Sequence, residues 1–156
     1  MNTRRPYIFL IKITLFALVI SAIPLPEIFL DISPFWMLLF YIYWISYLPV
    51  KNIFFLALIL GMLLDVLQGN IIGQNALALI LSSAFIIKAK QSFFVSNVST
   101  QQVYVFVASV IYLASILIVH ILTQGFNFSY YILIAPLSSA IFWSLIRLAL
   151  INHKHQ

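Results

Sequence analysis

The chain has 156 residues, of which 64% are hydrophobic and only 7% are charged, and its mean hydropathy is +1.13. A water-soluble domain cannot cover so much apolar surface, so this composition excludes a soluble protein and indicates one integral-membrane domain over 1–156. The net charge of +5 comes from basic residues scattered between apolar runs, so we expect no nucleic-acid partner. The chain has no cysteine, which excludes disulfides and cysteine-based metal sites.

Six apolar runs of similar length follow one another along the chain. Each is close to the ~20 residues that cross a ~30 Å hydrocarbon core as an α-helix. None shows the alternating pattern of a barrel strand. We therefore predict an all-α membrane protein, a bundle of six transmembrane helices. The predicted spans are about 7–24, 34–50, 52–68, 71–88, 103–122 and 130–151.

The first run follows Arg4-Arg5, a pattern that also occurs in signal peptides. The run is longer than the apolar region of a usual signal peptide, and Lys12 interrupts it. Ser21-Ala22-Ile23-Pro24 is a poor cleavage site. We therefore interpret this run as the first, uncleaved span.

The second run carries an aromatic face. Phe40 and Tyr43 are three residues apart on one side of a helix, and Trp44 lies beside them. These side chains are too deep in the span for an interfacial aromatic belt, so they are candidates for contact with a partner helix. Core packing is the alternative explanation. Pro49 ends the run in a tight turn.

The third run contains Asp65, the only acidic residue after position 31. A carboxylate in a membrane segment is costly unless it faces a partner or a wet cavity, so it marks a candidate site. Helical rise places it about 20 Å from the cytoplasmic end, at a depth similar to Gln74, Asn75 and His120. We expect these groups to form one outer-leaflet cluster that binds a partner or a small ligand, with Gln74, Asn75 or a protonated His120 donating to Asp65.

A structural role for Asp65 is the alternative to a binding cluster. Asp65 then only caps the turn at 68–75, and asparagine should replace it well. Gly69 and Gly73 match a close-packing motif but straddle this turn, so we expect turn geometry to be their use. Gly61 is a packing candidate on the same run. The next connection, about 89–102, is the longest and most polar in the chain.

The basic residues indicate the orientation of the bundle. Six of them fall on one side of the six-span arrangement, and Lys12 and Arg147 are close enough to extend to that side. The opposite loops contain no lysine or arginine, and their only charged residues are Glu27 and Asp31. Both termini are therefore expected in the cytoplasm. This charge pattern does not distinguish two full spans in 52–88 from a re-entrant hairpin, but segment length favours crossing. The six basic residues on the side expected in the cytoplasm are Arg4, Arg5, Lys51, Lys88, Lys90 and Lys154.

The sequence contains no catalytic motif. It has no Ser/His/Asp order, no His-Glu helix motif and no phosphate-binding loop, so we expect neither enzymatic activity nor a cofactor. His153 and His155 are separated by a lysine in the C-terminal tail, where a solvated tail explains them better than a metal site does.

The stretch from Gly61 to Leu77 reads G-x-L-L-D-x-L-x-G-x-x-x-G-Q-x-A-L and resembles the central signature of the MreD family. Pro34-x-Trp36, Tyr43-Trp44 and Pro49 also follow the order of landmarks in that family. The resemblance implies a non-enzymatic subunit of the bacterial inner membrane that acts in rod shape. Its implied partners are membrane lipid and an MreC-like protein, which connects it to an MreB-like actin filament and to the polymerase and transpeptidase of peptidoglycan synthesis.

The family fold is also similar to the six-helix substrate-binding subunits of energy-coupling-factor transporters, which implies an outward-facing pocket. The alternative function is therefore a membrane subunit that binds a vitamin or another small solute. Such a pocket needs several converging polar groups. This chain offers few beyond Asp65, Gln74, Asn75 and His120.

Overall fold

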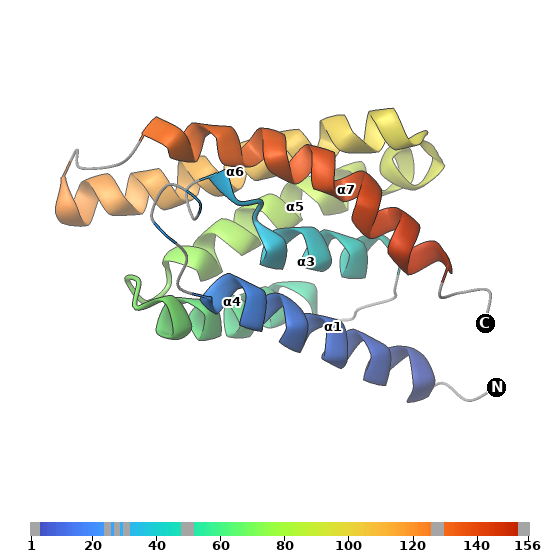
Figure 1. Ribbon diagram of the computed structural model, residues 1–156, viewed down its shortest axis with the longest axis horizontal. Coiled ribbons are helices and arrows are strands. Elements are labelled where there is room, and N and C mark those ends of the chain that lie inside the picture. Colours follow the sequence, from blue (N-terminus) through green and yellow to red (C-terminus); the bar gives the residue numbers. More distant parts are fainter. Residues whose placement is uncertain are drawn as a thin grey trace.

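The computed structural model describes residues 4–23, 26, 29, 32–47, 52–125 and 130–152 (Figure 1). Every regular element in this part of the chain is a helix, which confirms the all-α prediction. The elements are α1 (Arg4–Ala22), α3 (Trp36–Tyr47), α4 (Ile53–Gln68), α5 (Gln74–Val95), α6 (Val98–Gln124), the 3-10 helix η1 (Tyr130–Ile134) and α7 (Ala135–Asn152).

Three helical stretches are long and apolar enough to cross a membrane, namely Gln74–Val95, Val98–Gln124 and Tyr130–Leu148. The other apolar helical stretches among the described residues are shorter and cover Lys12–Ser21, Trp36–Ser46 and Ile53–Gln68. Long apolar helices of this kind agree with a membrane-embedded protein. Some residues named in the sequence analysis lie outside the described residues, namely Glu27, Asp31, Pro49, Lys51 and the tail from His153.

Helix α3 lies in the middle of the helices, between α7 on one side and α1 on the other (Figure 1). Side chains all around α3 are buried, and a helix that is hydrophobic on every face is typical of such a central position. Phe40 is 9% exposed and Tyr43 is 4% exposed, so the chain's own helices cover both. Trp44 is half-buried. The aromatic face of α3 therefore packs mainly inside the chain.

The connection between α5 and α6 differs from the long polar loop expected at about 89–102. Helix α5 continues to Val95 and α6 begins at Val98, so only Ser96 and Asn97 separate them. Polar residues mark where a helix leaves the hydrocarbon region, but they do not end it, because lysine and glutamine are good helix formers. The expected loop is therefore wrong, and α5 and α6 form a tight helical hairpin.

The side chain of Gln101 holds this hairpin together. It is completely buried, and its Nε2 donates to the backbone carbonyl oxygens of Phe93 (2.9 Å) and Ser96 (3.3 Å). Carbonyl groups at a helix C-terminus lack partners within the helix, and Gln101 supplies donors to them. Its Oε1 accepts a hydrogen bond from the indole nitrogen of Trp143 at 3.3 Å, which joins the hairpin to α7.

Candidate functional site

The turn between α4 and α5 is built on two glycines with left-handed backbone conformations. Gly69 has φ 67° and Gly73 has φ 97°, values that residues with a Cβ adopt only with strain. The N–H groups of Gly69 and Asn70 both donate to the carbonyl oxygen of Asp65, which closes the last turn of α4. Both glycines therefore lie where the turn needs a left-handed backbone. We call residues 65–75 the α4–α5 corner.

The side chain of Asp65 is fully buried and reaches from the last turn of α4 to the start of α5. Its Oδ2 accepts the N–H of Gly73 at 2.7 Å. Its Oδ1 accepts the backbone N–H of Asn75 at 3.0 Å and the side-chain Nδ2 of Asn75 at 2.8 Å. Gly73, the N-cap of α5, has no side chain that could cap the helix. Asp65 therefore caps α5 from the preceding helix, where the helix dipole favours a negative charge.

Asn75 connects this carboxylate to the next helix. While its Nδ2 donates to Asp65, its Oδ1 accepts a hydrogen bond from the hydroxyl group of Tyr112 on α6. Tyr112 is buried, and its ring lies 4.8 Å from the ring of Phe35, just before α3. Sequence analysis did not identify Tyr112. The α4–α5 corner is thus anchored to α6 through a chain of buried hydrogen bonds.

Gln68 extends the same network to α1. Its Nε2 donates to the carbonyl oxygen of Ser21 at 3.0 Å. Its Oε1 accepts hydrogen bonds from Asn70 at 2.9 Å and from Asn75 at 3.2 Å. Unlike Asp65 and Asn75, Gln68 is exposed. The network therefore runs from a buried centre at Asp65 to the surface of the bundle, and it touches α1, α4, α5 and α6.

The structure brings some of the expected site residues together. The hydrogen bond expected between Asp65 and Asn75 is present. Gln74 is buried in the first turn of α5, and its backbone N–H donates to the carbonyl oxygen of Ile71. His120 is half-buried on α6, eight residues or about 12 Å beyond Tyr112. Because the donors that the structure gives for Asp65 are Gly73 and Asn75, the pairing with Gln74 or His120 stays a prediction.

Gly61, one helical turn before the corner on α4, sets the distance between α4 and α5. A Cβ atom at this position would lie 2.2 Å from the Cα atom of Ala76, so the two backbones are in direct contact. The packing role expected for Gly61 is therefore present. Small residues allow such close approach between membrane helices.

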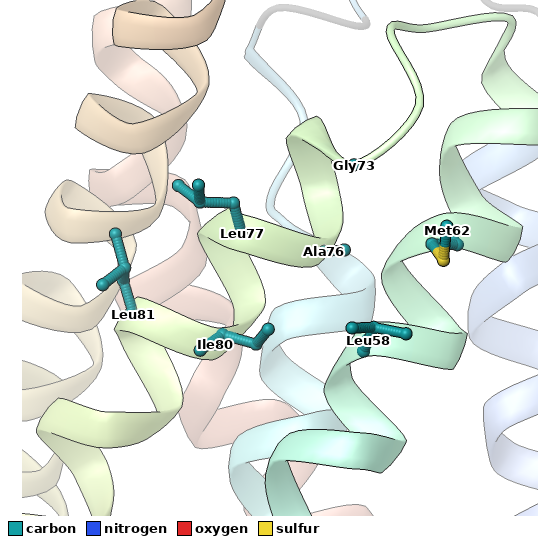
Figure 2. Close-up of a pocket in the computed structure, with 7 residues that line it drawn as sticks. All are labelled: Leu58, Met62, Gly73, Ala76, Leu77, Ile80 and Leu81. Atoms are coloured by element: carbon teal, nitrogen blue, oxygen red, sulfur yellow. The ribbon is translucent and has the colours of Figure 1, made fainter.

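An open groove of about 400 Å³ runs beside the contact between Gly61 and Ala76. Figure 2 shows that its lining residues come from α4 and α5, with Gly73 at the start of α5. All the lining side chains are apolar, so the groove offers no side-chain hydrogen bonds to a polar solute. The lining residues are Leu58, Met62, Gly73, Ala76, Leu77, Ile80 and Leu81.

The chemistry available at the corner is that of a structural network. Both oxygens of Asp65 accept hydrogen bonds from N–H groups of the same chain. Among the described residues no three His, Cys, Asp or Glu side chains are grouped closely enough to hold a metal ion. The corner can fix the relative positions of the helices that meet there.

Comparison with known proteins gives one match. The family model described as rod shape-determining protein MreD matches residues 3–152. The match therefore includes the α4–α5 corner and every helix named above. No curated protein and no solved structure matches the chain.

Proposed function

The chain belongs to the MreD family of rod shape-determining proteins, and we propose that it is a non-enzymatic subunit of the rod-shape complex in the bacterial inner membrane. In this role it helps to link an MreB-like filament, through an MreC-like protein, to the polymerase and transpeptidase of peptidoglycan synthesis. The family match and the apolar helices support the coarser part of this proposal, a membrane protein that determines rod shape.

The observation that carries the proposal is that the residues of the signature from Gly61 to Leu77 hold helices together. Gly61 brings α4 and α5 into contact, Gly69 and Gly73 shape the turn, and Asp65 and Asn75 join the helices through buried hydrogen bonds. Each of these residues holds helices in place, and their hydrogen bonds are made within the chain. This use supports a scaffold, whose function is to present a fixed surface to partners.

We further propose that all six α-helices, the three shorter ones included, cross the membrane and that both termini are cytoplasmic. Successive helices would then alternate in direction, with the α4–α5 corner at the outer side and the turn between α5 and α6 at the inner side. Lys88 and Lys90 lie in the last two turns of α5, next to that inner turn. Their position supports the orientation through the positive-inside rule.

The transporter-subunit alternative is not favoured. A vitamin or another polar solute needs several free polar groups that converge on a pocket. At the corner Asn75 donates to Asp65 and accepts a hydrogen bond from Tyr112, and the groove between α4 and α5 is lined by apolar side chains. These features give a polar solute few groups to bind.

Complementation tests the proposal. The chain should restore rod shape when it is expressed in a rod-shaped bacterium depleted of its own MreD protein, and an MreC-like protein should co-purify with it. A variant carrying Gly73→Val, which strains the turn, serves as the matched negative control. Round cells despite normal membrane abundance of the unmodified chain, together with no recovery of an MreC-like protein, would contradict the proposal.

A further inference from the structure

Five buried polar side-chain atoms among the described residues have no hydrogen-bond partner: Trp44 Nε1, Ser46 Oγ, Ser109 Oγ, Arg147 Nε and Arg147 Nη1. Two of the five belong to one guanidinium group, which is permanently charged. Buried polar groups in proteins are nearly always paired, and a charged group without a partner is the most costly exception. Within the part of the chain that the structure describes, two nitrogens of the Arg147 guanidinium group are therefore buried without an acceptor.

Arg147 and Trp44 lie at the same level of two neighbouring helices. Helices α3 and α7 pack against each other and run in the same direction (Figure 1). They are joined where they begin, because the N–H of Phe35 donates to Ser139 Oγ at 3.0 Å. From Phe35 to Trp44 is nine residues and from Ser139 to Arg147 is eight, which correspond to about 13 and 12 Å of helix.

The chemistry of these groups limits the kind of ligand that could bind them. The indole N–H and the guanidinium N–H groups only donate hydrogen bonds, so the ligand must supply acceptors. Because the guanidinium is charged, an anion is the matching acceptor. The chain has only three acidic residues. Asp65 already accepts three hydrogen bonds at the other side of the bundle, and Glu27 and Asp31 precede α3 in the sequence.

We propose that Arg147, together with Trp44, binds the phosphate group of an anionic phospholipid at the ends of α3 and α7. Arg147 lies five residues before the end of α7, in a helix of membrane-spanning character, where a lipid headgroup is the anion that the bilayer supplies. Trp44 lies in the last turn of α3 (Trp36–Tyr47), so in this proposal it is nearer the membrane surface than the sequence suggested, and tryptophan is enriched at this interface. Arg147 is only half-buried, so its long side chain can turn the covered donors towards the headgroup.

Native mass spectrometry of the full chain purified in detergent tests this inference. The probes are phosphatidylglycerol, phosphatidylcholine with the same acyl chains, and inorganic phosphate. We expect the chain to retain one phosphatidylglycerol in preference to phosphatidylcholine. Arg147→Gln should weaken this binding about tenfold, since a charge-assisted hydrogen bond is lost. Trp44→Phe, which keeps an aromatic ring but removes the N–H group, should weaken it less.

Lys12→Gln is the matched control, because Lys12 is an exposed basic residue and its loss changes the net charge equally. The inference requires that Lys12→Gln retain the phosphatidylglycerol that Arg147→Gln loses. Equal losses in the two variants would mean that only net charge matters and would overturn the proposed site. Displacement of phosphatidylglycerol by millimolar inorganic phosphate would identify a free anion as the ligand and would also overturn it.

The melting temperature of each purified variant shows whether it is folded. If Arg147→Gln does not fold, Arg147→Lys and Trp44→Phe replace it, and unchanged lipid preference in both would overturn the proposal. Lipid binding is measured on the isolated chain, so its failure is separate from a failure to restore rod shape.

Discussion

Replacing Asp65 with asparagine tests whether the corner needs a carboxylate or only one acceptor oxygen. Oδ1 accepts two hydrogen bonds from Asn75, and Oδ2 accepts one from Gly73. Asparagine keeps a single oxygen, so its NH₂ group would face an N–H group that also donates. Loss of one charge-assisted hydrogen bond and the unpaired N–H should lower the free energy of unfolding by about 2–4 kcal/mol. Asparagine is therefore a poor replacement even for a purely capping role, contrary to the expectation from sequence.

Asp65→Leu removes the acceptor for all three donors and should lower the free energy of unfolding further than Asp65→Asn. Equilibrium unfolding in mixed micelles, followed by tryptophan fluorescence, measures both changes. Gln68→Leu is the control, because Gln68 is exposed and its loss should cost only about 1 kcal/mol. If Asp65→Asn stays within about 0.5 kcal/mol of the unmodified chain, the requirement for two oxygens is refuted.

Three further predictions concern the same helices. Gly61→Ala places a methyl group 2.2 Å from the α5 backbone and should lower the free energy of unfolding by about 3 kcal/mol. The control is Gly69→Ala, which strains the backbone but meets no neighbouring atom, and it should lower this free energy by about 1–2 kcal/mol. Equal losses in the two variants would contradict the close contact at Gly61. Tyr112→Phe should lower the free energy of unfolding by about 1 kcal/mol. An unchanged free energy of unfolding would contradict the buried hydrogen bond from Tyr112 to Asn75. In this cysteine-free chain, Asn70→Cys should react with an impermeant thiol reagent outside intact cells and Asn97→Cys only after permeabilisation; labelling of Asn97→Cys in intact cells would contradict the topology.

The centre of the corner could be predicted from sequence because its residues are close together in the chain. A single carboxylate in an apolar run stands out, and its donors lie at most ten residues further on. Tyr112 could not be predicted, because it is 37 residues from Asn75 and is one of eight tyrosines in an aromatic-rich chain. Only the packing of α5 against α6 selects this tyrosine.

Helix ends and buried faces were harder to predict for a different reason. Hydropathy marks the boundary of the lipid phase, so Lys88 and Lys90 suggested a loop where α5 in fact continues to Val95. Similarly, the spacing of Phe40 and Tyr43 identifies one face of a helix but not the neighbour that covers it. Because α3 is buried on all sides, the covering helices belong to the same chain.

The short sequence distance between Asp65 and its donors has a consequence for biogenesis. Gly73 and Asn75 leave the ribosome immediately after Asp65, whereas Tyr112 is translated well over thirty residues later. A nascent α4–α5 hairpin therefore carries the hydrogen bonds that its carboxylate needs when it enters the bilayer, before α6 exists. The acidic residue can thus be inserted as part of a self-sufficient unit, and α6 then docks onto a hairpin that is already formed.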